Sequence, residues 1–389
     1  MQSYSKYFIL GLLTFSVAAE ASQLSGAPET GNTKTKNFFR AAWDWLIAPD
    51  ETLDSTYIYQ APTNWTVSLE NDLSRTGALF KTRGHLENLV HPTGSYSYLW
   101  DVRMQSEYSD VMGAYLTLGP ITLGWGSEVG KQSAQSNNNQ YFCLLDAWYG
   151  ISFRYNSIYN PLRSTLYNYT TGFQRQINTH TSGHFRSLIV NAYYAFDHSR
   201  FAYNAAYDGS YIQRRSRGSM LAMAKYAYGD LRMPKNDTEF LLFCGGNHRY
   251  STHQLSVGPG YSYNWVLFHR DAAPHSIKGL HNLTFNATLS PMLTLINRLN
   301  TYTGTFDENG DNFQMGDKIS AAQKIHFNVF ARAAACYSFG RYSLNATFDF
   351  NRFGLHTENT EVYDDEISTY KSKCRFYDWM ASVMLNVKF

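Results

Sequence analysis

The sequence predicts a transmembrane antiparallel β-barrel of about twelve strands, within a range of ten to fourteen, with a short N-terminal helix. Three observations support this all-β fold class: an alternating apolar face in the last strand, an export signal, and a composition rich in aromatic and poor in charged residues. Together they indicate an exported chain that crosses a membrane with strands.

The last eleven residues alternate large apolar side chains with polar or smaller ones. Successive side chains of a strand point to opposite faces, so one face carries Ser382, Asn386 and Lys388. The other face consists of Trp379, Ala381, Val383, Leu385, Val387 and Phe389. This pattern fits a strand that closes a barrel against lipid, and it also fits an edge strand of a soluble sheet.

Residues 1–21 have the pattern of a secretory signal peptide. One basic residue, Lys6, precedes an apolar run that ends near the small-residue site Ala19-Glu20-Ala21. The run is too short for a membrane helix, which needs about 20 apolar residues. We therefore expect a cleaved signal peptide (1–21), a periplasmic segment (22–55) with a short amphipathic helix at 37–47, and a barrel (56–389). Only helices and closed barrels satisfy the backbone in hydrocarbon, so we expect the exported chain in the cell outer membrane.

Composition separates a secreted globular protein from a barrel. Aromatic residues make up 16% of the chain and charged residues also 16%, whereas soluble domains contain roughly 25% charged residues. Aromatic girdles at both membrane interfaces explain this excess in a barrel. The formal net charge of +2 is too small to predict a nucleic-acid partner. The expected partners are outer-membrane lipid and lipopolysaccharide, the barrel-assembly machinery and, if the lumen is open, a small solute.

Beyond Pro49, segments of about ten residues with alternating hydrophobicity are separated by turn-forming residues, which is typical of a barrel. The alternation is clear in 279–291 and 341–353, and in 322–338 it places Asn328, Arg332 and Ser338 toward the lumen. It is ambiguous in 217–229, where Lys225 lies beside Met223. The predicted strands are 64–73, 95–104, 110–118, 120–130, 140–155, 185–197, 217–229, 254–268, 279–291, 322–338, 341–353 and 374–389.

Orientation follows if Phe389 lies at the periplasmic end. The turn at 339–341 is then periplasmic, and the long segments 156–184, 230–253, 297–321 and 354–373 are outer loops. Cys336 and Cys374 then lie at opposite ends of the wall, too far apart for a disulfide. Cys143 shares a face with Tyr141, Leu145 and Tyr149, so we expect a lipid-facing free thiol there.

Three segments resemble a known family. They are Asp54-Ser55-Thr56-Tyr57-Ile58, the stretch 201–207 followed by 213–219, and Gly258-Pro259-Gly260-Tyr261-Ser262-Tyr263-Asn264. They are similar to a Bacteroidota outer-membrane family described as domain of unknown function forty-four twenty-one, from about residue 50 to the C-terminus. Arg217 departs from that pattern, where a small residue is expected. The resemblance implies an outer-membrane barrel and brings no catalytic residues.

The sequence does not favour an enzyme. It contains no Gly-x-Ser-x-Gly elbow, and a hydrolase triad needs a nucleophile, a histidine and an orienting group brought together. The histidines are scattered along the chain, and the acidic stretch 307–312 lacks the spacing of a calcium loop. We expect no catalytic residue, cofactor or metal, and keep a barrel-type hydrolase as a minor alternative.

The connection 198–216 joins an arginine cluster to aromatic residues. It holds Arg200, Arg214 and Arg215, with Arg217 just beyond it. The connection is too long for a simple periplasmic turn, so we expect it to fold into the lumen as a plug. Its arginines would then pair with lumenal carboxylates such as Asp146 and Asp349, because unpaired charges are costly inside. The other lumen candidates are Arg154 and Arg332.

Two classes of function remain open from sequence alone. One is a narrow or plugged pore for small solutes. The other is a non-conducting structural or binding barrel that presents its outer loops. Barrels of eight strands fill with side chains and those of sixteen leave a channel, so a count of about twelve does not decide between them.

Overall fold

The computed structural model describes residues 52–60, 65–88, 96–105, 108–119, 121–128, 138–145, 147–243, 247–271, 279–306, 313–322, 326–363 and 366–389. The predicted signal peptide and the predicted helix at 37–47 lie outside these ranges. No helix among the described residues is long and apolar enough to span a membrane.

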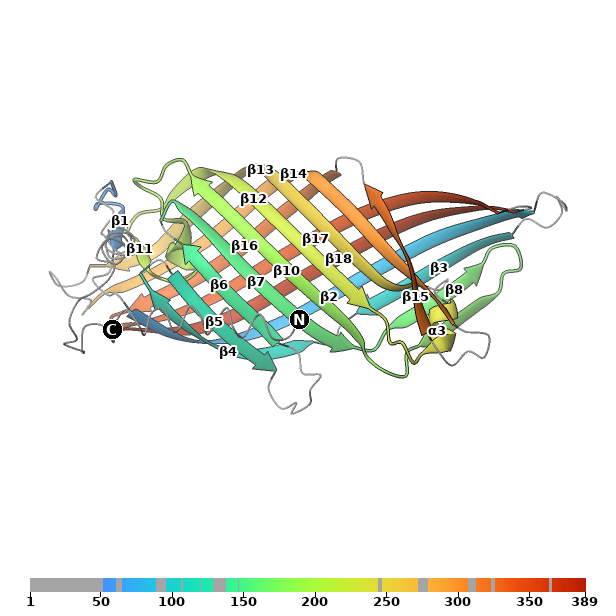
Figure 1. The fold of residues 1–389 in the computed structure, drawn as a ribbon. Helices are drawn as coiled ribbons and strands as arrows, with labels where there is room; N and C mark the ends of the chain where they lie inside the picture. The colour runs from blue at the N-terminus through green and yellow to red at the C-terminus, as the bar shows by residue number, and fades with distance from the viewer. Residues whose placement is uncertain are drawn as a thin grey trace, which may run out of the picture. The chain divides into compact units, whose positions relative to one another are not determined.

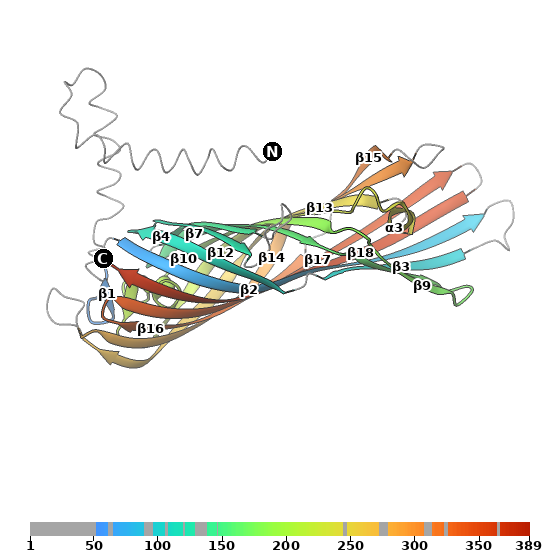
Figure 2. The same ribbon diagram turned by 90° about the horizontal axis from the view of Figure 1, so that it is seen from below.

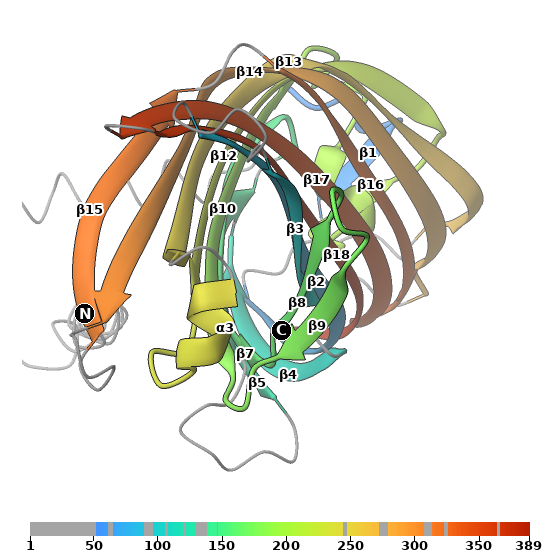
Figure 3. The same ribbon diagram turned by 90° about the vertical axis from the view of Figure 1, so that its right-hand side faces the viewer.

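The described chain forms a closed antiparallel barrel of twelve wall strands (Figures 1 and 3). Its closure is made by β18 and β2, which pair from Glu366 with Asn88 to Lys388 with Thr66. The wall strands are β2 (Trp65–Asn88), β3 (Tyr96–Gln105) with β4 (Ser109–Leu118), β5 (Ile121–Glu128), β6 (Asn138–Leu145), β7 (Tyr149–Asn160), β10 (Gly183–Ala195), β12 (Arg217–Arg232), β13 (Asn247–Arg270), β14 (His281–Phe306), β16 (His326–Phe339), β17 (Tyr342–Tyr363) and β18 (Glu366–Lys388).

The strand number was correct only because two errors cancelled. β3 and β4, predicted as separate wall strands, both pair with β2: Gly77 opposes Gln105, and Ser74 opposes Ser109. They therefore form one interrupted wall strand. The predicted strand 140–155 is instead β6 and β7, which pair with each other from Asn138 with Ser157 to Leu145 with Gly150. That turn contains neither Gly nor Pro, so no helix- or strand-breaking residue marks it in the sequence.

The end of the barrel far from the C-terminus, termed the outer end after the predicted orientation, carries extra structure. β8 (Arg163–Asn168) and β9 (Gln174–Asn178) extend the sheet from β3, β15 (Phe313–Ala322) pairs with β14, and α3 (Thr238–Phe243) lies between β12 and β13. The predicted outer loop 354–373 is largely a β17–β18 hairpin, and 297–321 is largely strand. The β2–β3 and β17–β18 hairpins reach beyond the other wall strands (Figure 2).

The two faces of the wall differ as the alternation predicted. Inward positions are polar: Asn286, Ser290 and Asn345 are buried. Outward positions on the same strands are apolar and exposed, as at Leu289 (57%) and Leu344 (47%). The ambiguous strand β12 turns both Met223 and Lys225 inward. An apolar outer surface around a polar interior is the arrangement of a transmembrane barrel.

The prediction that Cys143 faces lipid was wrong. Its thiol is buried at 1% exposure on the lumen side, where it packs with Leu145, Tyr193 and Tyr203. The interior is apolar at this height because a chain segment fills it, so the rule that apolar residues face lipid fails. Cys336 is also inward and buried. It opposes Asn345, which opposes Met384, and Cys374 lies ten positions further along β18. At about 3.3 Å per residue, this separation excludes a bridge between Cys336 and Cys374.

Candidate functional site: the obstructed lumen

The connection between β10 and β12 folds into the barrel end that holds the C-terminus. Its central part, residues 201–213, is termed the plug. It contains the short 3₁₀ helix η2 (Tyr203–Ala206) and strand β11 (Tyr211–Gln213), which pairs with β1 (Ile58–Gln60). Phe201, Tyr203 and Tyr207 are each no more than 3% exposed. The segment is therefore ordered against the barrel interior, as its aromatic content predicted.

Amide side chains of the wall anchor the plug backbone. Asn264 Nδ2 donates to the Ala202 carbonyl at 2.8 Å, and Asn282 Nδ2 donates to the Gln213 carbonyl at 2.8 Å. Lys388 Nζ, from the last strand, donates to the Gly209 carbonyl at 2.5 Å. These contacts satisfy backbone groups that would otherwise be buried without partners.

Gly209 is required where the plug reverses direction. Its φ is +67°, a left-handed conformation that favours glycine. A Cβ atom there would also lie 3.1 Å from Ser343 Oγ and 3.3 Å from Cys336 Sγ. The turn therefore lies directly against the wall.

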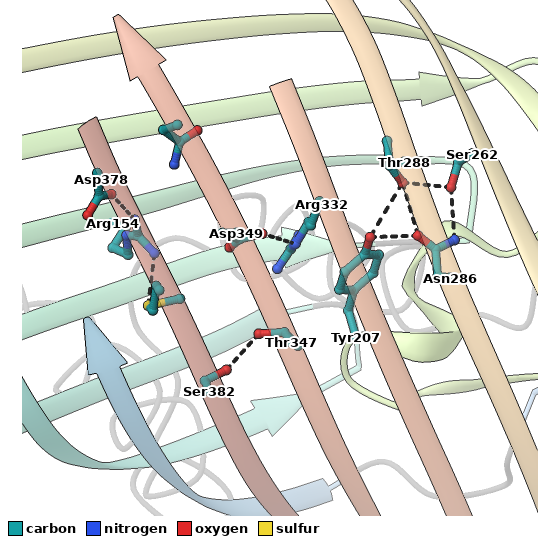
Figure 4. Close-up of polar contacts among 12 residues, drawn as sticks. Arg154, Tyr207, Ser262, Asn286, Thr288, Arg332, Thr347, Asp349, Asp378 and Ser382 are labelled. Atoms are coloured by element: carbon teal, nitrogen blue, oxygen red, sulfur yellow. Dashed lines mark hydrogen bonds and ion pairs between the residues drawn. The ribbon is translucent and has the colours of Figure 1, made fainter. Parts of the chain in front are cut away.

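Tyr207 connects the plug to the charged middle of the lumen (Figure 4). Its hydroxyl donates to Asn286 Oδ1 at 2.6 Å, and the Arg332 guanidinium lies 3.9 Å from its ring centroid. Arg332 also forms an ion pair with Asp349, with Nε 2.8 Å from Oδ1. Both were predicted lumen residues, and they lie on adjacent strands β16 and β17.

Above the plug, two side-chain contacts cross the lumen. Arg154 of β7 and Asp378 of β18 form an ion pair at 2.6 Å, with side chains 9% and 8% exposed (Figure 4). Lys225 of β12 donates to Asn351 Oδ1 of β17. Asn351 and Asp378 are neighbours across β17 and β18. Along the shorter path around the barrel, four strands lie between β7 and β18, namely β6, β5, β4 and β2. The ion pair therefore crosses the lumen. The four residues Arg154, Lys225, Asn351 and Asp378 are termed the crossbar.

A cavity lies between the plug and the crossbar. Its volume is about 90 Å³, and both structures line it: Tyr203 and Tyr207 from the plug, Arg154 and Asn351 from the crossbar. Glu70 and Asp72 of β2 and Tyr115 of β4 also line it. The cavity therefore presents carboxylates, guanidinium groups and phenol hydroxyls to whatever occupies it.

The cluster 200–217 does not place its arginines in the lumen, which corrects the prediction. Arg200 pairs with Asp54 at 3.4 Å, Arg214 with Asp271 at 2.8 Å, and Arg217 with Asp197 at 2.5 Å. The Arg215 guanidinium lies 5.6 Å from the Tyr57 ring centroid.

These guanidinium groups stay at the rim because water and rim carboxylates solvate them there, whereas the lumen would have to pay for their desolvation. The hydrogen bond with His269, and then the charge of Arg214, hold the pKa of Asp271 below its usual value. Asp146, the other predicted partner, lies outside the described residues.

Lys225 and Asp378 were not identified as lumen residues from sequence, whereas Tyr207 was expected in the lumen as part of the connection 198–216. The alternation of the last strand, extended upward from Ser382, would have placed Asp378 inward. No sequence pattern could have paired it with Arg154, 224 positions away, because that contact depends on barrel closure.

One serine–histidine pair bears on the hydrolase alternative. Ser157 Oγ lies 2.8 Å from His184 Nε2 on the outward side of β7 and β10. The other ring nitrogen, Nδ1, faces Arg186 Nε at 3.4 Å, and the ring stacks on Tyr159 at 4.0 Å. A triad needs an acceptor that holds the histidine in the base form, and a guanidinium opposes that role. Among the described residues there is no group of three or more metal-ligating side chains.

Comparisons with solved structures return barrel proteins at low similarity. Outer membrane protease OmpT from Escherichia coli is 8% identical, with TM-score 0.31, over 83% of this chain and 97% of that one. A Pseudomonas aeruginosa FadL homologue is 10% identical, with TM-score 0.20, over 84% and 90%. The P. putida toluene transporter TodX is 8% identical, with TM-score 0.16, over 82% and 90%.

No curated protein matches the sequence. A family model does match, over residues 52–376, which include most of the wall, the whole plug and the upper part of β18. This chain belongs to the family described as Domain of unknown function (DUF4421).

Proposed function

We propose that this chain is an outer-membrane barrel whose lumen is a plugged, low-conductance passage for small polar solutes. The observation that carries the proposal is the pair of obstructions around an unfilled cavity. The plug occupies one end with buried aromatic rings, and the crossbar spans the middle with charged side chains.

The polarity of the cavity supports small polar solutes as the cargo. Arg154, Arg332, Asp349 and Asp72 line it together, so both signs of charge are present. A solute with hydrogen-bonding groups can replace contacts that these side chains make with each other, whereas an apolar solute would leave them unpaired. Mixed charge also predicts weak selectivity between anions and cations, in place of the anion preference that lumenal plug arginines would give.

The non-conducting binding barrel remains the second candidate. It is favoured by the structure at the outer end, where β8, β9, β15 and α3 add to the wall. In that case the plug and the crossbar would serve only to stabilise the barrel, and no treatment that preserves the wall should open it.

Planar-bilayer recording of the refolded protein distinguishes the two. We expect small and infrequent current steps for the native chain, and larger steps after residues 199–215 are replaced by a short Gly-Ser bridge. A matched control shortens the β17–β18 hairpin by removing 358–371, which leaves Thr357 and Ser372 as a two-residue turn and keeps the pairing of His356 with Lys373. Because that hairpin tip lies at the outer end, its removal should leave the current unchanged.

Heat-modifiable migration on gels checks that each variant folds. If the bridge variant does not fold, the double substitution Tyr203→Ala and Tyr207→Ala removes two plug rings within an intact connection and should also raise the current. A large native current, or a current that neither plug variant changes, would contradict the proposal.

A further inference from the structure

The outer end of one side of the wall carries a dense set of basic and aromatic side chains, termed the basic face. It lies on β7, β10, β12, β13, β14 and the added strand β15. Its members are Tyr155, Tyr159, His184, Arg186, Tyr226, Tyr228, Asp230, Arg232, Arg249, His253, Arg298, Tyr302 and Lys318.

Strand register shows that these residues point away from the lumen. Tyr228 opposes Leu188 and His253, whereas the next position along β12, Ala227, opposes Ile189 and Gln254. Ala227 and Gln254 line one lumenal cavity and Ile189 lines another, and Tyr228 lines neither of these two. Because successive side chains of a strand alternate, Tyr228 and its partners lie on the outward side.

A buried carboxylate organises the centre of the basic face. The Asp230 side chain is 2% exposed and pairs with two guanidinium groups: Arg249 Nε at 2.5 Å and Arg232 Nε at 3.1 Å. Arg249 also lies 4.7 Å from the ring centroid of Tyr302. Since both carboxylate oxygens are used, the two guanidinium groups are held in place with other N–H groups left to bind an anion.

The remaining bases add further positive charge. Arg186 opposes Asp230 across β10 and β12, but both oxygens of that carboxylate already pair with Arg232 and Arg249. Among the described residues, no carboxylate forms an ion pair with Arg186, Arg298 or Lys318. Arg298 opposes His253, and Lys318 opposes Tyr302, so both adjoin the centre. The rim arginines at the other end differ, since Arg200, Arg214 and Arg217 each face a carboxylate.

The basic face continues directly into the lipid-facing surface. Ile296 is outward and 45% exposed, and it opposes Leu255, which opposes Tyr226. Below this row the same strands expose Met220, Tyr261 and Leu289. The bases and tyrosines therefore begin where the apolar surface ends, at the level of lipid headgroups.

Stacked rings in the basic face offer surfaces for sugars. His184 and Tyr159 stack at 4.0 Å with nearly parallel planes, and His253 lies 4.9 Å from the Tyr228 ring while its Nδ1 is 2.9 Å from the Tyr226 hydroxyl. Paired flat rings with polar edges suit amphipathic groups at a membrane interface.

We propose that the basic face binds the phosphorylated sugar headgroup of an outer-leaflet glycolipid of the lipid A type. Guanidinium groups bind phosphate oxygens through two parallel hydrogen bonds. Here Arg232 and Arg249 are pre-positioned by Asp230, and Arg186, Arg298 and Lys318 supply additional charge. The acyl chains of such a lipid would lie on the apolar wall below. The inference rests on the outer-membrane location and the orientation proposed above, but not on whether the lumen conducts.

Native mass spectrometry of the full chain in detergent, titrated with diphosphoryl lipid A, tests the inference. We expect saturable binding, weaker binding of monophosphoryl lipid A, and still weaker binding of phosphatidylethanolamine. The triple variant Arg186→Gln, Arg298→Gln and Lys318→Gln should lose about tenfold or more in affinity, since a charge-assisted hydrogen bond contributes roughly 1.5–3 kcal/mol. Asp230 and its two arginines are unchanged in this variant, so the wall should fold.

The matched control removes the same charge elsewhere. Arg163, Arg175 and Arg341 are exposed and lie off the basic face, and their replacement by Gln should leave affinity unchanged. Equal loss in both variants would show nonspecific attraction and overturn the proposal, as would unchanged binding in the first. Competition by inorganic phosphate as strong as that by lipid would assign the site to free anions instead. The bilayer current should be the same in both variants, so failure here is separable from failure of the proposed pore.

Discussion

The plug and the crossbar obstruct the same lumen by different physical means. The plug is ordered backbone, held by donors such as Asn264, Asn282 and Lys388 and packed with aromatic rings. The crossbar is four buried side chains that meet across the lumen, with an ion pair between Arg154 and Asp378 and a hydrogen bond from Lys225 to Asn351. Displacing the plug requires many contacts to break together, whereas the crossbar opens when two long side chains change rotamer. The plug is therefore the main barrier and the crossbar the part able to respond to a solute.

The largest effect should come from removing the plug together with the ion pair of the crossbar. In the Gly-Ser bridge variant, adding Arg154→Ala and Asp378→Ala removes an ion pair that crosses the lumen. Since the two obstructions lie in series, the increase in single-channel conductance of the combined variant should exceed the sum of the increases that the two separate variants show. The control is the exposed pair Arg175 and Glu239, which lies at the outer end. Its double alanine variant should leave conductance unchanged, and simple additivity in the combined variant would argue against series closure.

Removing one member of the Arg154–Asp378 ion pair should lower the unfolding free energy more than removing both members. Asp378→Ala leaves the buried Arg154 without its carboxylate, so we expect a loss of about 3 kcal/mol in unfolding free energy. The paired variant Arg154→Met with Asp378→Leu removes both charges and should be close to native. Urea unfolding in lipid vesicles measures both. Equal losses for the single and paired variants would mean that Arg154 is solvated by water in the cavity.

Tyr207→Phe should have the smallest effect. It removes the hydroxyl that donates to Asn286 but keeps the ring under Arg332. We expect about 1 kcal/mol lower unfolding free energy and an unchanged native current, because the plug remains in place. An opened lumen in this variant would show that one hydrogen bond, and not the packed segment, holds the plug.

The inward and outward faces of strands, which depend on local alternation, were predictable from the sequence. Contacts across the lumen, which depend on barrel closure, were not. The polar sides of 279–291, 341–353 and the last strand all face the lumen as expected, because period two fixes them once one face meets lipid. The predicted strand boundaries were wrong at 146–148, because no Gly or Pro marks the turn there. The predicted lipid-facing orientation of Cys143 was wrong because the plug makes the interior apolar at that height.

The candidate site was predictable only in part. Arg332 and Asp349 were placed in the lumen by alternation, Arg154 was named as a lumen candidate, and the plug was predicted from its aromatic residues. The arginines of 200–217 were misassigned because their partners Asp54, Asp197 and Asp271 lie in rim segments whose proximity follows from the closed ring. The Arg154–Asp378 pair of the crossbar could not be predicted, because β7 and β18 face each other across the lumen only when β18 pairs with β2.

Thiol accessibility tests most directly whether the plug closes the lumen. Cys143 and Cys336 are buried and inward at plug height, and replacing Cys244 and Cys374 by Ser leaves them as the reporters. In the native chain, reconstituted in vesicles, we expect neither a charged, membrane-impermeant maleimide nor a lipid-soluble one to label Cys143 or Cys336. After replacement of 199–215, the charged reagent should label both. Labelling of Cys143 by the lipid-soluble reagent, or rapid labelling of the native chain by the charged reagent, would contradict a lumen closed by residues 201–213.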